Sequence, residues 1–137
     1  MKTNELMIGN IVECSEGNTL YVNCIGYGEV SGIVKTFDDI YCLKEKASNL
    51  KPIPITEELL RKNGFDDDTG TLCFKYYCLN MEHHTVTVRG ISNTPGRDWS
   101  VRIANNDAQT VASADVQYLH QLQNILNIMD IKLDLVI

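Results

Sequence analysis

The sequence predicts an α+β protein in which a small N-terminal SH3-like β-barrel precedes a short helix, an antiparallel β-meander and a long C-terminal helix packed on that meander. Short β-rich runs separated by Gly, Asn and Asp fill the first part of the chain. Pro52 and Pro54 then interrupt this pattern. Near the end, apolar residues recur at spacings of three and four, which is typical of an amphipathic helix.

The barrel is expected from four runs, at residues 8–13, 19–25, 29–37 and 40–43. Gly26, Gly28 and Gly32 permit the bends that a tightly curled sheet requires. These glycines do not match a dinucleotide-binding loop, because their spacing is wrong and a β-rich run follows them in place of a helix.

The domain boundary is expected at Pro52 and Pro54, which force an extended segment and divide the chain into units 1–54 and 55–137. Thr56 is placed to cap a short helix whose first turn is acidic. Gly64 is expected to end this helix in a left-handed conformation.

The second unit is expected to contain strands at 71–79, 84–90 and 99–104, with a hairpin loop at Pro95 and Gly96. The longest helix is expected to start at Ser113 or Asp115. Its apolar stripe comprises Val116, Leu119, Leu122, Ile125, Leu126 and Met129. Residues 132–137 alternate again and predict a terminal strand. The acidic run 66–68 fails as a calcium loop, because the required glycine and acid are out of position.

Composition narrows the class of protein. The net charge of −6 argues against a chain that coats nucleic acid over its whole surface, although a local basic patch in the second half remains compatible with it. Five scattered cysteines are expected to be reduced thiols, since an odd, dispersed number does not resemble a disulfide framework. The apolar runs are short, so we expect a cytoplasmic protein without membrane association.

Three segments together carry a resemblance. They are Ile8–Asn10, residues 52–58, which read Pro-Ile-Pro-Ile-Thr-Glu-Glu, and residues 118–124, which read Tyr-Leu-His-Gln-Leu-Gln-Asn. In this order they resemble uncharacterised small proteins of phages and mobile elements of Bacteroides-type gut bacteria. The resemblance implies an N-terminal segment ending in the Pro-Ile-Pro stretch, a short helix ending at Gly-Phe and a closing helix. It implies no activity and no functional residues.

Reactive side chains are dispersed along the sequence. Cys73, Cys78, His83 and His84 include zinc-type ligands, but Cys73 and Cys78 would point to opposite faces of one strand. Buried thiols beside a pair of loop histidines are therefore the favoured interpretation. No serine-nucleophile or metalloprotease motif occurs, so we expect a non-enzymatic protein without metal or cofactor.

Two surfaces are candidates for binding. The first is the amide-rich face opposite the apolar stripe of the long helix, a candidate interface with a protein partner or a second copy. It comprises Gln117, His120, Gln121, Asn124 and Asn127. The second is a basic and aromatic face of the meander, suited to stacking bases and contacting phosphates. It comprises Lys75, Arg89, Arg97, Trp99 and Arg102.

The leading hypothesis is thus a non-enzymatic phage or mobile-element accessory protein that acts through protein contacts. The alternative is a nucleic-acid-binding module that uses residues 75–102 of the meander.

Overall fold

The computed structural model describes residues 1–72, 74–90 and 99–137, which form two compact units. The first unit consists of Met1–Ile53 together with Tyr118–Asn124. The second consists of Pro54–Gln117 together with Ile125–Ile137. The division expected from the prolines, at 1–54 and 55–137, did not include the return of residues 118–124 to the first unit.

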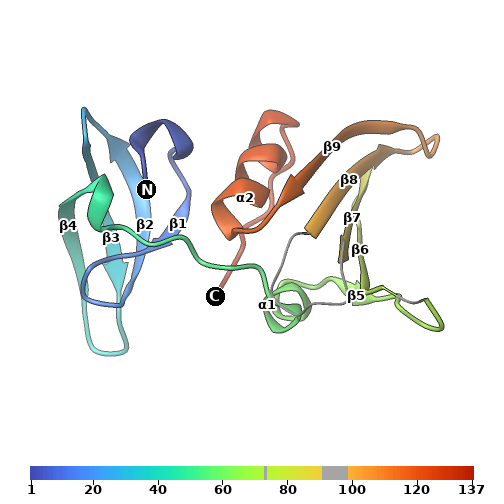
Figure 1. Ribbon diagram of the computed structural model, residues 1–137, viewed down its shortest axis with the longest axis horizontal. Helices are drawn as coiled ribbons and strands as arrows, with labels where there is room; N and C mark the ends of the chain where they lie inside the picture. Colours follow the sequence, from blue (N-terminus) through green and yellow to red (C-terminus); the bar gives the residue numbers. More distant parts are fainter. Residues whose placement is uncertain (73, 91–98) are drawn as a thin grey trace. The chain divides into compact units, whose positions relative to one another are not determined.

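The first unit is built on a four-stranded antiparallel sheet with the order β1-β2-β3-β4 (Figure 1). Its elements are η1 (Thr3–Glu5), β1 (Ile11–Glu13), β2 (Thr19–Ile25), β3 (Glu29–Lys35), β4 (Ile40–Lys46) and η2 (Ala47–Asn49). Alternate residues of the strands bury one face, because successive side chains of a strand point to opposite sides. The core includes Leu20, Val22, Val30 and Val34.

This sheet is open, so the predicted SH3-like barrel is wrong. Among the described residues β1 pairs with β2 and β4 pairs with β3, whereas closure would require β1 and β4 to pair with each other. β1 has three residues, and its outer edge is already hydrogen-bonded. The N–H of Ile11 bonds to Gln123, and Glu13 exchanges two backbone bonds with Lys51. Among the described residues, the outward backbone groups at Ile11 and Glu13 are therefore already bonded and cannot pair with β4.

Gly32 marks a close approach of two strands and not a bend. It lies within β3 opposite Val22, and a Cβ atom added there would stand 2.2 Å from the backbone oxygen of Tyr21. A larger residue at this position would force the two strands apart.

The second unit contains a five-stranded antiparallel sheet with the order β5-β6-β7-β8-β9 (Figure 1). Its elements are α1 (Glu57–Lys62), β5 (Asp66–Asp67), β6 (Tyr76–Asn80), β7 (His84–Gly90), β8 (Trp99–Asn105), β9 (Thr110–Val116) and the last part of α2 (Leu119–Ile128). Strands β7 and β8 lie close to the predicted positions. β5 and β9 were not predicted, and the predicted loop at Pro95 and Gly96 lies outside the described residues.

Helix α1 has the predicted ends. The Oγ1 atom of Thr56 accepts the N–H of Leu59 at 3.1 Å, which caps the first turn. Gly64 has a φ of 83°, a left-handed conformation in which glycine is favoured. Phe65 then donates its N–H to the carbonyl of Leu60, which closes the last turn.

The prediction of a long helix starting at Ser113 or Asp115 is wrong. Residues 110–116 form β9, and Val116 lies opposite Trp99 in the sheet, so α2 begins only at Leu119 and has ten residues. The predicted apolar stripe included Val116, which belongs to β9, together with residues of α2. No helix in the described ranges has the length and apolar character needed to cross a membrane.

The C-terminal residues 132–137 do not form the predicted strand. The side chain of Asn63 holds them instead: its Nδ2 donates to the carbonyl of Val136 at 2.8 Å, and its Oδ1 accepts the N–H of Val136 at 2.7 Å. A single amide side chain thus replaces the ladder that the alternating sequence had suggested. Taken together, the described chain is dominated by two antiparallel sheets, with helices as a minor part.

Candidate functional site

The amide-rich face predicted on the C-terminal helix is divided by the structure. Gln117, Gln121 and Asn127 are exposed, and Gln117 precedes α2. His120 and Asn124 pack within the first unit, where His120 is buried and Asn124 is half-buried. These five residues therefore do not form one solvent-facing surface.

Two amide side chains in the middle of α2, Gln123 and Asn124, hold it against β1 and the residues just before it. Gln123 accepts the N–H of Ile11 at 2.9 Å with its Oε1 and donates its Nε2 to the carbonyl of Gly9 at 3.1 Å. Asn10 donates its Nδ2 to the Oδ1 of Asn124 at 2.8 Å. Asn10 and Gln123 are buried and were not singled out from the sequence. They stabilise the edge of the sheet, and the hydrogen bonds that they make there use the amide groups that a partner would need.

His120 is a buried histidine in the first turn of α2, within the first unit. Its ring stacks on Tyr118 at a centroid distance of 5.9 Å, and its Nδ1 has no hydrogen-bond partner among the described residues. Burial lowers the pKa of His120, the carboxylate of Glu5 opposes this, and the N-terminal ammonium adds to it. The neutral imidazole is therefore the form that the fold favours.

We expect the first unit to lose stability as pH falls below the ordinary histidine pKa of 6.5. The folded pKa is lower, so the unfolded chain binds the proton first and the loss continues until the folded histidine also titrates. The slope approaches about 1.4 kcal/mol per pH unit at most. Urea unfolding followed by circular dichroism, at about pH 7 and about pH 5.5, should show a smaller difference for His120→Gln than for the unmodified chain. Equal differences would contradict the assignment.

The five-stranded sheet has one apolar face and one face that we call the polar face. Tyr77, Val88 and Val101 lie opposite one another and are buried on the apolar face. The residues directly before and after each of them in its strand therefore point to the polar face. Two rows of opposed residues cross the polar face: Tyr76, Arg89, Ser100 and Asp115 in one, and Cys78, Thr87, Arg102 and Ser113 in the other.

Two of the predicted nucleic-acid residues, Arg89 and Arg102, share the polar face. The guanidinium of Arg89 lies 5.2 Å from the centroid of the Phe74 ring, and Phe74 and Tyr76 have centroids 6.4 Å apart. The guanidinium of Arg102 donates to the carbonyl of Ala108 at 3.3 Å. A basic and aromatic cluster thus exists near Arg89.

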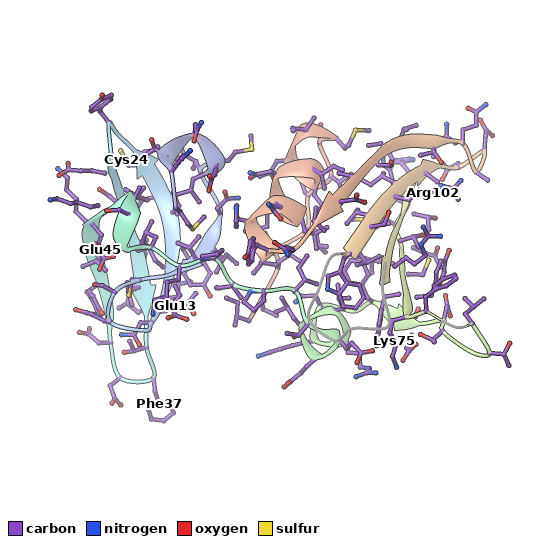
Figure 2. All side chains as sticks on the ribbon, viewed as in Figure 1. Glu13, Cys24, Phe37, Glu45, Lys75 and Arg102 are labelled. Atoms are coloured by element: carbon purple, nitrogen blue, oxygen red, sulfur yellow. The ribbon has the colours of Figure 1, made fainter. Side chains whose placement is uncertain are left out.

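The other predicted nucleic-acid residues do not join this cluster. Trp99 is buried and donates its Nε1 to the carbonyl of Ile55 at 3.1 Å, so its ring cannot stack on a base. The ammonium of Lys75 pairs with Glu57 at 3.3 Å, on the side of α1 (Figure 2). Arg97 lies outside the described residues.

The possible zinc ligands are also separated. Cys78 pairs with Thr87 on the polar face, whereas His84 belongs to the opposite face together with Val86. Burial raises the pKa of the Cys78 thiol, which disfavours the thiolate that a metal requires. His83 is exposed in a turn, and Cys73 lies outside the described residues. Within the described ranges, no group of three or more His, Cys, Asp or Glu side chains could hold a metal ion.

A polar network not predicted from the sequence joins α1 to the sheet. The hydroxyl of Tyr77 contacts Glu57 at 2.9 Å and Asp67 at 3.4 Å, and Arg61 pairs with Asp67 at 3.2 Å. Burial raises the pKa of Tyr77 to about 12, while hydrogen bonds from Thr69 lower the pKa of Asp67 to about 2. Tyr77 is fully buried, so its hydroxyl is held for packing and cannot meet a substrate.

The β3–β4 hairpin exposes an apolar surface that the sequence analysis had assigned to strands. Phe37 is 103% exposed and Ile40 is 67% exposed. Figure 2 shows Phe37 at the tip of the hairpin, projecting away from the sheet. Tyr21 and Ile33 oppose each other on the same outer face as Ile40 and are half-buried. We call Tyr21, Ile33, Phe37 and Ile40 the hairpin patch. Its signal in the sequence is a Phe directly before the Asp38-Asp39 turn, where a polar residue is usual.

A second exposed aromatic residue occupies the β2–β3 turn. Tyr27 is 105% exposed and stands between Gly26 and Gly28. Its phenol carries a hydroxyl that water can hydrogen-bond, and Glu29 follows two residues later. Tyr27 therefore presents a more polar side chain than Phe37.

Comparison with known proteins adds no identity to this description. No protein-family model matches the chain, and no curated protein or solved structure matches it significantly.

Proposed function

We propose that this chain is a non-enzymatic accessory protein, of the phage or mobile-element kind that its sequence resembles, and that it acts by binding another protein through the hairpin patch. The observation that carries the proposal is the exposure of Phe37 and Ile40 on one hairpin. Apolar side chains gathered on a surface are typical of protein-binding sites, whereas single exposed ones need no explanation.

The shape of the patch fits an anchor that enters a partner's pocket. Phe37 projects from a short turn, and the turn is held by Thr36, whose N–H donates to the carbonyl of Asp39 at 2.8 Å and whose Oγ1 accepts the N–H of Asp39 at 3.0 Å. A held turn loses little conformational entropy when it binds. Aromatic anchors of this kind commonly dominate the binding energy of an interface.

The proposal can be tested by photo-crosslinking. A photoreactive phenylalanine analogue placed at Phe37 in the full chain, expressed in the native host, should form a cross-link to a discrete protein partner. The same analogue at Tyr27, the exposed aromatic residue of the other turn, is the matched control and should not. Equal cross-linking at both positions, or none at Phe37, would contradict the proposal.

Phe37→Ser should weaken binding of the cross-linked partner by at least about tenfold. It should leave the midpoint of thermal unfolding unchanged, because the replaced side chain is fully exposed and contributes nothing to the core. Titration calorimetry and a thermal scan measure the two quantities separately. A lowered unfolding midpoint would show that Phe37 packs within the protein.

Binding of single-stranded nucleic acid on the polar face is the second candidate. The observation that favours it is the stacking of Arg89 on Phe74 beside Tyr76, because a ring and a guanidinium together can bind a base and a phosphate. The charge of the face weighs against it. Asp115 lies in the row of Arg89, so the two arginines are not a free basic surface.

Fluorescence anisotropy distinguishes the two candidates. If the polar face binds nucleic acid, Arg89→Ala should weaken binding of a labelled single strand and reduce its salt dependence by about one counterion. Phe37→Ser should then have no effect on that binding. No binding at low salt would remove this candidate and leave the hairpin patch.

A further inference from the structure

We infer that β4 is a self-complementary edge strand that pairs in antiparallel fashion with β4 of a second copy of this chain. The inference concerns the backbone edge of β4 and is independent of the partner proposed for the hairpin patch.

The two edges of this sheet are treated differently by the fold. β1 is covered, because Gln123 and Lys51 take up its outward backbone groups. In the part of the chain that the structure describes, no backbone hydrogen bond joins residues 41–46 to any segment except β3. Figure 1 shows β4 at the outer edge of the sheet. An edge of this kind presents unpaired N–H and C=O groups to any extended chain.

The geometry of β4 suits strand addition. It has seven residues, contains no proline, and pairs with β3 over seven successive positions without a register shift. Tyr41 and Leu43 point to the core side and remain only partly buried there. A strand added at this edge would cover both side chains while it completes the hydrogen bonds.

The sequence of β4 indicates that its own copy is the occupant. In an antiparallel pair centred on Leu43, Lys44 lies opposite Cys42 of the second copy. Glu45 then lies opposite Tyr41, and Lys46 opposite Ile40. No like charges face each other in this register.

Other registers of the two β4 strands that keep the core-facing side chains of both copies on the same side of the sheet are less favourable. A shift of two residues one way places Lys44 opposite Lys44 of the second copy. A shift the other way places Asp39 opposite Glu45. Like charges directly opposite each other destabilise a strand pair. Within a pair of β4 strands, charge thus favours the register centred on Leu43 over its two neighbours.

The lysines of β4 have an alternative role, since charged residues protect edge strands from unwanted pairing. Lys44 is held in an ion pair with Glu29 of β3 at 2.8 Å. Both side chains are largely exposed, so this pair weakens the repulsion between Lys44 and a neighbouring lysine without removing it. In the register centred on Leu43, Lys44 also meets a neutral side chain, so it restricts the register without preventing pairing.

Cys42 is exposed, so its replacement is expected to leave the fold of the monomer unchanged. Cys42→Lys places lysine opposite Lys44 of the second copy at two symmetry-related positions, and should weaken self-association by about tenfold. Cys42→Asp places an opposite charge there and should strengthen it. Cys24 lies on the same outer face but in the interior strand β2 (Figure 2), so Cys24→Lys is the matched control and should have no effect.

Analytical ultracentrifugation of the full chain under reducing conditions, over a wide concentration range, measures the dimerisation constant of each variant. Opposite shifts for Cys42→Lys and Cys42→Asp, with Cys24→Lys unchanged, support the inference. A chain that stays monomeric at every concentration overturns it, as does a dimer that is indifferent to charge at residue 42. Phe37→Ser leaves this dimer unchanged, so the result is separate from the test of the hairpin patch.

Discussion

Replacing Trp99 with alanine is expected to lower the free energy of unfolding of the second unit by about 3–5 kcal/mol, the range for removing a large buried aromatic residue. The Trp99 ring packs edge-on against Tyr77, with centroids 6.2 Å apart, and its Nε1 donates to the carbonyl of Ile55. Alanine loses the packing, leaves a cavity and removes the hydrogen bond. Urea unfolding followed by far-ultraviolet circular dichroism measures the change.

Trp99→Phe separates the two contributions of this side chain. Phenylalanine keeps an aromatic ring in the core but cannot donate to the carbonyl of Ile55, so the expected loss is smaller, about 1–3 kcal/mol. A surface residue used to stack bases would behave differently, because either substitution would then leave stability almost unchanged. Stability within about 0.5 kcal/mol of the unmodified chain would therefore show that Trp99 is not buried.

Replacing Gln123 with leucine is the second large expected effect, a loss of about 1–3 kcal/mol in the free energy of unfolding of the first unit. Leucine preserves the approximate volume but leaves the buried N–H of Ile11 and the carbonyl of Gly9 without their partner. A backbone group without a hydrogen bond is costly where it is buried, as the N–H of Ile11 is. Gly9 is exposed, so its carbonyl can bond to water instead.

Hydrogen exchange provides a local measurement of the same effect. The amide proton of Ile11 should exchange faster in Gln123→Leu than in the unmodified chain, because Oε1 of Gln123 is its acceptor. Asn127→Ala, at an exposed position of the same helix, is the control and should change neither stability nor this exchange rate. Unaltered protection of Ile11 in Gln123→Leu would contradict the contact.

Local signals predicted local structure. The ends of α1 were predicted correctly from Thr56 and Gly64, because a cap and a left-handed glycine act within one turn of helix. Strands β7 and β8 were placed correctly, since alternating side chains record which face of a strand is buried. These interactions span a few residues, so the sequence contains all that is needed to recognise them.

The candidate binding surfaces were predicted less well. Trp99 and Arg102 are close in sequence, yet one is buried and the other is exposed on the polar face. Asn124 was assigned to a free helix face, but it contacts Asn10 far away in the chain. The hairpin patch was missed because exposure of Phe37 depends on how the turn leaves the sheet, and composition does not report that.

By itself, the sequence determined the cap of α1, the strand character of the first unit and the dispersal of its reactive groups. Tertiary structure alone decided that the first sheet stays open, that residues 110–116 are a strand and that Gln123 is committed to β1. The physical reason is that each of these outcomes depends on where backbone donors and acceptors find partners more than a hundred residues away or on another strand. An apolar or polar pattern shows which side of an element is buried, but not what covers it.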